Sequence, residues 1–235
     1  KRTSHFNDLM KNGKLKGGLR LTPKALTFNF EVQEPSPKTN GSTLGIDIGQ
    51  TTTLSLSDGS TSQKNNHGHD LNSVQDILSR KKKGSKAFKR AVEHRKNIIN
   101  WTVNQLNLSN VKEVRLENIK NLRRGRKSSR KLSHWSYTTI REKLESYCRE
   151  QGVLVTKISP TYTSQRCCQC GWVQKSNRKG KKFCCKSCGS TMDADINAAK
   201  NIGTSLQAIS KKKRLSHDNL KGFFWLSDES EELIV

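Results

Sequence analysis

The hydrophobic and polar positions of the chain alternate with two different periods, and each period predicts one kind of secondary structure. Apolar residues at every second position, as at Leu44, Ile46 and Ile48, predict strands, whereas apolar residues three and four positions apart predict amphipathic helices. The predicted elements are strands at 44–48 and 51–57, helices at 71–80 and 85–106, a strand at 111–117, a helix at 135–149, a strand at 152–159 and, after a cysteine-rich stretch, a last helix from 193. This order predicts an α/β fold built on a mixed sheet with flanking helices.

The first 40 residues give a weaker pattern than the rest of the chain. They are basic, and only the alternation of Leu26, Phe28 and Phe30 predicts a strand before two prolines end it. One strand cannot bury a core of its own, so residues 1–40 are expected to be the remnant of an upstream domain. A chain that begins with Lys1 also fits one piece of a longer protein.

The net charge of the chain indicates a binding partner, which the hydrophobic pattern does not. The chain carries 44 Lys and Arg against 20 Asp and Glu, a formal net charge of +24, which a polyanion such as nucleic acid would neutralise. An apolar content of 31% in periodic segments favours a folded domain over a disordered basic protein. The expected nucleic-acid contacts lie in two basic stretches, and they are Lys81, Lys82, Lys83, Lys86, Lys89 and Arg90 in the first, and Arg123, Arg124, Arg126, Lys127, Arg130 and Lys131 in the second.

Six of the seven cysteines lie in two clusters, which indicates metal binding in a reducing compartment. Cys167 and Cys170 form one C-x-x-C-G pair, and Cys185 and Cys188 form another after a 14-residue basic loop. This spacing predicts a ribbon with a structural Zn²⁺, because four thiolate ligands leave no open position for catalysis.

The remaining cysteines leave alternatives open. Cys168 lies inside the first pair and Cys184 directly precedes the second, so either of them can compete for the metal, and a disulfide between them is the other possibility. Cys148 lies on the apolar stripe of the helix at 135–149 and is expected in the core.

Three carboxylates stand where an acidic site is expected. Asp47 lies on the first strand between two glycines that leave room for a metal ion and a phosphate, and Glu117 ends the strand at 111–117. Asp195 shares its helix face with small apolar residues, whereas Asp193 is better placed as the N-cap of that helix. Asp47, Glu117 and Asp195 are the acidic ligands that a nuclease with two Mg²⁺ ions requires.

Four motifs give the chain a resemblance to a known family. They are G-I-D-I-G, R-L-E-N, T-S-Q-x-C-x-x-C-G and D-x-D-x-N-A-A-x-N-I, and they resemble the split RuvC motifs and zinc ribbon of TnpB, the nuclease of small insertion sequences, and of compact type V CRISPR effectors. The resemblance covers roughly residues 43–204. It implies an RNase H-like fold, RNA-guided cleavage of DNA, a catalytic role for Asp47, Glu117 and Asp195, and zinc ligation by the two C-x-x-C pairs.

The resemblance also implies a division of the chain and a set of partners. The expected parts are a wedge-like remnant at 1–40, the first nuclease part at 41–160 with a basic helical insertion at 71–107, the zinc ribbon at 161–191, the last nuclease helix at 192–210 and a tail at 211–235. Guide RNA and target DNA are the expected partners. A second protein chain is a further candidate, because the N-terminal recognition lobe of full-length relatives is missing.

Two other functions fit the same residues. In the first of these functions, the chain is a non-cleaving, RNA-guided DNA-binding protein. The missing lobe favours this function, and the intact carboxylates oppose it. The second is a zinc-ribbon RNA-binding protein of ribosomal type, which would need no Mg²⁺. With no apolar run of about 20 residues and no visible signal peptide, the chain is expected in the cytoplasm of a bacterial, archaeal or phage-infected cell, near the nucleoid.

Overall fold

The computed structural model describes residues 4–23, 25–119, 136–206 and 222–226, and the chain divides into two units, Lys1–Ser36 and Pro37–Val235. Each unit is described by itself. Within the described residues, no helix is long and apolar enough to cross a membrane.

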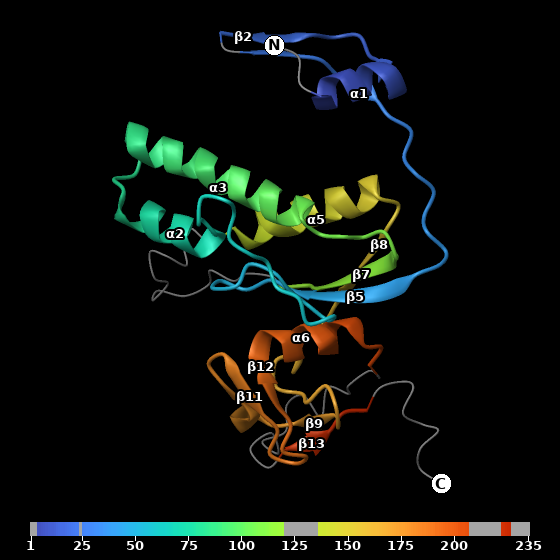
Figure 1. Cartoon of the computed structure of the whole chain (residues 1–235), viewed down its shortest axis with the longest axis vertical. Helices are drawn as coiled ribbons and strands as arrows, with labels where there is room; N and C mark the ends of the chain where they lie inside the picture. Colours follow the sequence, from blue (N-terminus) through green and yellow to red (C-terminus); the bar gives the residue numbers. More distant parts are fainter. Residues whose placement is uncertain (1–3, 24, 120–135, 207–221, 227–235) are drawn as a thin grey trace. The chain divides into compact units, whose positions relative to one another are not determined.

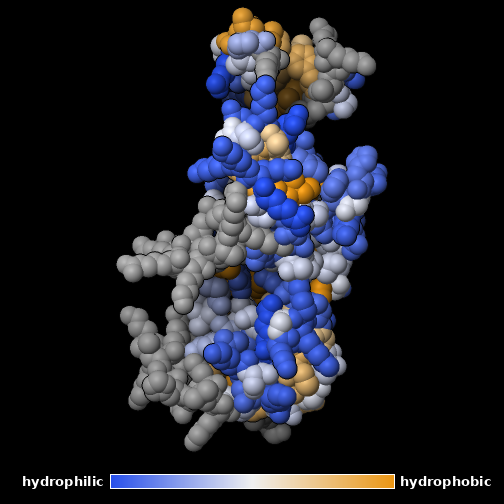
Figure 2. All heavy atoms as spheres, turned by 90° about the vertical axis from the view of Figure 1, so that its left-hand side faces the viewer, coloured by the Kyte–Doolittle hydropathy of each residue, from blue (hydrophilic) through white to orange (hydrophobic). Residues whose placement is uncertain are grey.

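The first unit contains more structure than the single strand expected for it. Helix α1 covers Ser4–Asn12, and the Phe6 ring contacts the rings of Phe28 and Phe30 edge-on, with centroids 5.2 and 5.8 Å apart. Four short strands pair as β1 (Lys14–Leu15) with β4 (Phe30–Glu31) and β2 (Arg20–Thr22) with β3 (Ala25–Thr27). The unit exposes the large apolar side chains of Met10, Leu15, Leu19, Leu21, Leu26 and Val32. Orange, hydrophobic patches are visible on it in Figure 2.

The second unit is built on a four-stranded sheet, which is mixed as predicted, and its strand order is β6-β5-β7-β8. Strands β5, β7 and β8 run parallel, and β6 pairs with β5 in the antiparallel direction. The parallel pairing brings the carboxyl ends of β5 and β7 to the same edge of the sheet. The strand bounds are Ser42–Asp47 for β5, Ser55–Leu56 for β6, Val111–Glu117 for β7 and Leu154–Ile158 for β8.

Helices cover both faces of this sheet (Figure 1). Helices α2 (Leu71–Arg80), α3 (Lys86–Asn104) and α5 (Tyr137–Glu150) lie on one side, and α6 (Ala194–Gly203) lies on the other. Side chains cap the starts of two helices, since Asp70 accepts a hydrogen bond from the Ser73 amide and Ser85 accepts one from the Phe88 amide. The core between sheet and helices includes the fully buried Leu54, Leu78, Val114, Leu116, Ile140 and Leu144.

The cysteine-rich stretch folds into short strands next to α6. Strands β10 (Arg178–Lys179), β11 (Lys182–Cys184) and β12 (Thr191–Asp193) form an antiparallel sheet, and a 3₁₀ turn covers Lys175–Asn177. Strand β9 (Trp172–Val173) pairs with β13 (Phe223–Phe224). The tail expected at 211–235 therefore contributes one strand to this module.

Candidate active site and metal centre

The fold brings the three predicted carboxylates to one pocket, from three different elements. Asp47 ends β5, Glu117 ends β7, and Asp195 lies in the first turn of α6. All three line a pocket of about 470 Å³, together with loop residues from the β5–β6 connection and from the start of the cysteine-rich stretch. Residues 148 positions apart in the chain, Asp47 and Asp195, thus face the same space.

The two glycines that flank Asp47 at a distance of two residues also serve the packing of the backbone. A Cβ atom on Gly45 would lie 2.1 Å from the Ala199 carbonyl oxygen and 2.2 Å from the Gly203 nitrogen, so the space beside β5 is filled by the backbone of α6. A Cβ atom on Gly49 would lie 2.4 Å from the Thr52 carbonyl oxygen. Backbone atoms therefore occupy the Cβ side of both glycines, although Gly49 still lines the pocket with Asp47, and Gly45 lets the helix that carries Asp195 approach Asp47.

The two aspartates at the start of α6 divide their roles as predicted. Asp193 is the N-cap, and its Oδ1 accepts hydrogen bonds from the amides of Asp195 (2.8 Å) and Ile196 (3.2 Å). Asp195 is buried and points into the pocket, because residues two apart on a helix face in nearly opposite directions.

Burial and mutual repulsion dominate the electrostatics of the carboxylates. Burial first, and then the charges of Glu117 and Asp195, raise the pKa of Asp47 to about 7. Burial also raises the pKa of Glu117, while a hydrogen bond from the Thr163 hydroxyl and the charge of Arg178 act in the opposite direction. Such a cluster of buried acids favours the binding of cations.

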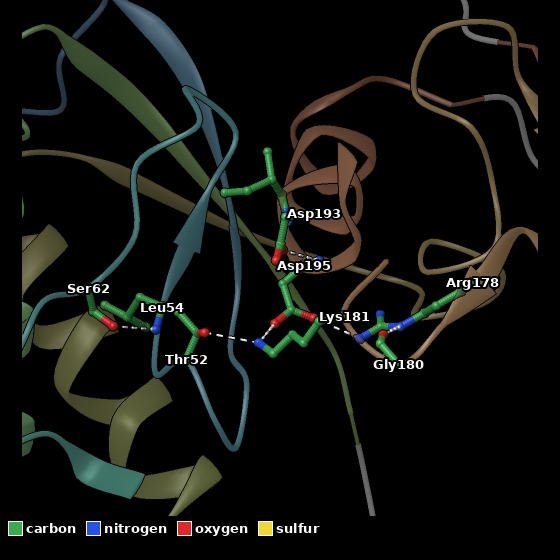
Figure 3. Close-up of polar contacts among 9 residues, drawn as sticks. Thr52, Leu54, Ser62, Arg178, Gly180, Lys181, Asp193 and Asp195 are labelled. Atoms are coloured by element: carbon green, nitrogen blue, oxygen red, sulfur yellow. Dashed lines mark hydrogen bonds and ion pairs between the residues drawn. The ribbon is translucent and has the colours of Figure 1, made fainter. Parts of the chain in front are cut away.

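Two basic residues of the cysteine-rich stretch neutralise part of this cluster, and sequence reasoning missed both. Arg178 Nη2 lies 2.7 Å from Asp195 Oδ1, and the Lys181 ammonium contacts Asp195 Oδ2 (Figure 3). Lys181 also donates to Thr52 Oγ1 at 2.9 Å, so it joins the β5–β6 connection to α6 (Figure 3). Both residues belong to the basic loop between the cysteine pairs, and no sequence signal distinguished them from its other Lys and Arg residues.

The four predicted zinc ligands come together. Their sulfur atoms all lie within 4.8 Å of one another, with 3.8 Å between those of Cys167 and Cys188 and 3.6 Å between those of Cys170 and Cys185. A tetrahedral ion with Zn–S bonds of about 2.3 Å separates its sulfur ligands by about 3.8 Å, so the spacing fits zinc. Among the described residues, no other group of three or more Cys, His, Asp or Glu side chains is gathered this closely.

The other two cysteines of the clusters, Cys168 and Cys184, do not join this group. Cys168 and Cys184 are both free thiols in the structure, and Cys168 Sγ instead lies 3.6 Å from the sulfur of Met192. The disulfide alternative is therefore absent from this structure. Cys148 is fully buried, as predicted for a core residue.

Half of the predicted nucleic-acid contacts fall within the described residues. Lys81, Lys82, Lys83, Lys86, Lys89 and Arg90 are all exposed, at the turn between α2 and α3 and along the first turns of α3. Figure 2 views the molecule from the side on which this turn lies in Figure 1, and hydrophilic side chains dominate that face of the second unit. The other predicted contacts, Arg123, Arg124, Arg126, Lys127, Arg130 and Lys131, lie outside the described residues.

Comparison with known proteins supports the resemblance drawn from the motifs. Residues 137–202 match the model of the family described as Cas12f1-like, TNB domain. The chain is 41% identical over 90 residues to the CRISPR-associated endodeoxyribonuclease Cas12f1 of Sulfoacidibacillus thermotolerans, covering 38% of this chain and 21% of that protein. It is 35% identical over 95 residues to a TnpB-like protein of Aquifex aeolicus, covering 37% of this chain and 31% of the relative. The predicted resemblance to TnpB and compact type V effectors is thus confirmed.

The fold has a counterpart among solved structures as well. The cryo-EM structure of a CRISPR-Cas12f ternary complex matches 85% of this chain and 47% of its own, with a TM-score of 0.50 and 20% sequence identity. At this identity the match shows a shared mixed α/β fold. The matched part of this chain spans about a fifth to a third of the length of the two relatives named above.

Proposed function

We propose that this chain carries the nuclease site of an RNA-guided DNA endonuclease, with an RNase H-like fold of the RuvC type. The observation that carries the proposal is the convergence of Asp47, Glu117 and Asp195 on one pocket beside a four-cysteine group that fits zinc. The relatives named endodeoxyribonuclease and TnpB-like add support from outside the chain. Two Mg²⁺ ions bound by the carboxylates would activate a water molecule and stabilise the leaving oxygen of the phosphodiester.

The residues of the chain supply the geometry for this reaction. Asp47 and Glu117 lie at the ends of adjacent parallel strands, so the sheet fixes the distance between them. The Thr163 hydroxyl donates a hydrogen bond that orients the Glu117 carboxylate. Arg178 and Lys181 place two positive charges at the pocket wall, where a phosphate group of DNA would meet them. The zinc ligands Cys167, Cys170, Cys185 and Cys188 would hold the loop that carries these cations.

The proposal assigns guide RNA and target DNA as partners. The exposed basic residues between α2 and α3 and the net charge of +24 suit a phosphate backbone, and base pairing to a guide would supply sequence specificity. We also propose a second protein chain as a further partner.

A pair of substitutions at the start of α6 tests the nuclease assignment. Asp195→Asn removes one negative charge from the pocket, so we expect Mg²⁺-dependent cutting of labelled single-stranded DNA to fall by at least about 100-fold. Asp193→Asn is the matched control, because asparagine caps helices as well as aspartate does, and this variant is expected to cut at the parental rate.

The same assay separates the alternatives. Zinc content and binding of DNA and RNA should be unchanged in both variants, because neither residue belongs to the four-cysteine group or to the basic stretches. Full cutting by Asp195→Asn would sink the catalytic assignment. A parent that binds nucleic acid but never cuts it, with any divalent cation, would favour the non-cleaving or the RNA-binding function.

A further inference from the structure

Helix α6 presents two different faces to its surroundings. Asp195 and Ala199 face the sheet, where Gly45 admits the helix backbone. Asn197 and Asn201 are four residues apart and therefore share another face, and both are fully buried. Since amides are buried only where their hydrogen bonds are satisfied, this face must meet a polar partner.

That partner is the backbone before the first zinc-binding turn. Asn197 Nδ2 donates to the Arg166 carbonyl oxygen at 2.7 Å, and Asn197 Oδ1 accepts from the Cys168 amide at 3.0 Å. Asn201 Nδ2 donates to the carbonyl oxygens of Arg166 at 2.7 Å and Thr163 at 2.8 Å. The helix that carries Asp195 is thereby bonded directly to the segment that carries the first cysteine pair.

The side chain of Arg166 extends this connection. Its guanidinium is buried, with the residue 3% exposed, and Nη1 donates to Asn201 Oδ1 at 2.7 Å. Its Nε donates to the carbonyl oxygen of Trp225 at 2.7 Å. Arg166 thus contacts α6 through both its backbone and its side chain, and its second acceptor is Trp225, the residue directly after β13.

Several contacts hold β13 and Trp225 in this position. The Trp225 amide donates to the Gly171 carbonyl oxygen at 2.9 Å, and the rings of Trp172 and Phe224 meet edge-on with centroids 4.8 Å apart. Gly222 has a φ of +83°, and a Cβ atom there would lie 2.3 Å from the Trp172 ring. Only glycine fits this entry to the strand without displacing it.

We propose that Arg166 is a positioning residue for Asp195, and that residues 222–226 are part of the support of the active site because they hold the Arg166 guanidinium. The inference rests on the proposed role of Asp195 in the nuclease site. Arg166 lies outside the pocket, so it acts through Asn201 and α6. Loss of such supporting hydrogen bonds typically costs about 10- to 100-fold in activity or metal affinity.

Arg166→Lys and Arg166→Met in the full 235-residue chain test the role of the guanidinium. A lysine ammonium is a compact charge without the planar fork of arginine, so it would not span both acceptors, and methionine would satisfy neither. We expect the rate of cutting of labelled single-stranded DNA at saturating Mg²⁺ to fall about 10-fold for lysine and 100-fold for methionine. Zinc content should stay at the parental value, and amide hydrogen exchange across 194–203 should become faster.

Gly222→Ala tests the C-terminal strand without altering the pocket or the zinc ligands. Displacement of β13 would remove the acceptor for Arg166 Nε. We therefore expect slower cutting and faster amide hydrogen exchange across 194–203, as for the Arg166 variants. Gly59→Ala is the matched control, because Gly59 also has a positive φ, +95°, but nothing lies within 4 Å of its Cβ position. This control should leave both measurements at the parental values.

Each outcome decides the proposal. Slower cutting with faster exchange in α6 and unchanged zinc supports it. Parental cutting and exchange in the Arg166 variants overturn it, and so does a loss of cutting that merely follows a loss of zinc. If the parent itself cuts no DNA, the proposed function fails separately, and the exchange across 194–203 alone decides whether Arg166 and residues 222–226 position α6.

Discussion

At the scale of the residue, the close approach of two backbones at Gly45 decides whether the site can form. The strand and the helix that carry two of the three carboxylates touch at this point, because no side chain separates them. The sequence marked Gly45 by its position beside Asp47, but only the fold reveals that its partner is α6. Gly45, two residues before Asp47, therefore serves the packing of β5 against α6 in this chain.

Gly45→Ala should accordingly destabilise the protein and slow cutting. The added Cβ would meet backbone atoms that cannot rotate away, and overpacking of this kind typically costs about 1–3 kcal/mol. Thermal unfolding measures the effect. Gly17→Ala is the control, since nothing lies within 4 Å of that Cβ position, and it should change the free energy of unfolding by less than about 0.5 kcal/mol. Equal melting temperatures for the two variants would contradict the packing role.

Cys148 allows a prediction about pH. Burial, with a smaller contribution from Glu145, raises the pKa of this thiol from 9.0 to about 12. The folded chain therefore keeps a proton that the unfolded chain loses, so the stabilisation is complete below pH 9 and is lost as pH rises towards 12. The free energy of unfolding should fall with pH in this window more steeply for the parent than for Cys148→Ala, by up to about 1.4 kcal/mol per pH unit.

Denaturant titrations between pH 8 and pH 11 measure this difference. Tyr137, whose pKa burial raises to about 12, titrates in both proteins and cancels in the comparison. Parallel stability curves for parent and variant would show that Cys148 is not protected in the folded chain.

At the scale of the element, the sequence predicted the regular parts well and the short ones poorly. The sequence predicted the strands that carry Asp47 and Glu117 and the helices α2, α3, α5 and α6. Each of these elements is long enough for its apolar residues to repeat with the period of a strand or a helix. Strands of two or three residues, as in the first unit and in the cysteine-rich stretch, have no period to detect. Their positions depend on pairing between distant segments, as for β9 with β13.

The same limit explains which site residues were missed. Asp47, Glu117 and Asp195 stand at ends of predictable elements, so their convergence could be expected from parallel strands and one helix face. Arg178 and Lys181 reach the pocket only because a loop between the cysteine pairs folds back over α6. A basic residue in a basic loop carries no local signal for such a long-range contact.

The turn between α2 and α3 carries a prediction about nucleic acid. Lys81, Lys82 and Lys83 are exposed and adjacent, so their replacement by glutamine should weaken binding of single-stranded nucleic acid. If all three contact phosphates, the slope of log K against log salt concentration should decrease in magnitude by about 2. Binding titrations from about 50 to 200 mM salt measure the slope.

A triple variant with the same loss of charge elsewhere controls for net charge. Lys112, Lys143 and Arg149 replaced by glutamine remove three charges from β7 and α5. We expect a smaller change of slope in this variant. Equal slopes in the two triple variants would show that total charge matters and the α2–α3 turn does not.

At the scale of the whole molecule, the four-cysteine group belongs to the same module as the two cations that contact Asp195. Cys188→Ser removes one of four thiolates, and we expect loss of zinc, release of Arg178 and Lys181 from Asp195, and loss of cutting even in excess Mg²⁺. Zinc content by elemental analysis and cutting of labelled DNA are the two measurements.

Cys184→Ser is the control within the same module. Its sulfur is outside the group of four, so this variant should keep both its zinc and its activity. Zinc loss in Cys184→Ser, or full zinc in Cys188→Ser, would show that the ligands had been assigned wrongly.

The pairing of β13 with β9 joins two segments that are synthesised at different times. Trp225, which holds Arg166, follows Asp47 by 178 residues. At roughly 5–20 residues per second, a ribosome needs roughly 9–36 s to make this stretch. Asp47 is therefore synthesised long before Trp225, and on the proposed role of Arg166 we expect the helix that carries Asp195 to gain its full support only after translation has passed residue 225.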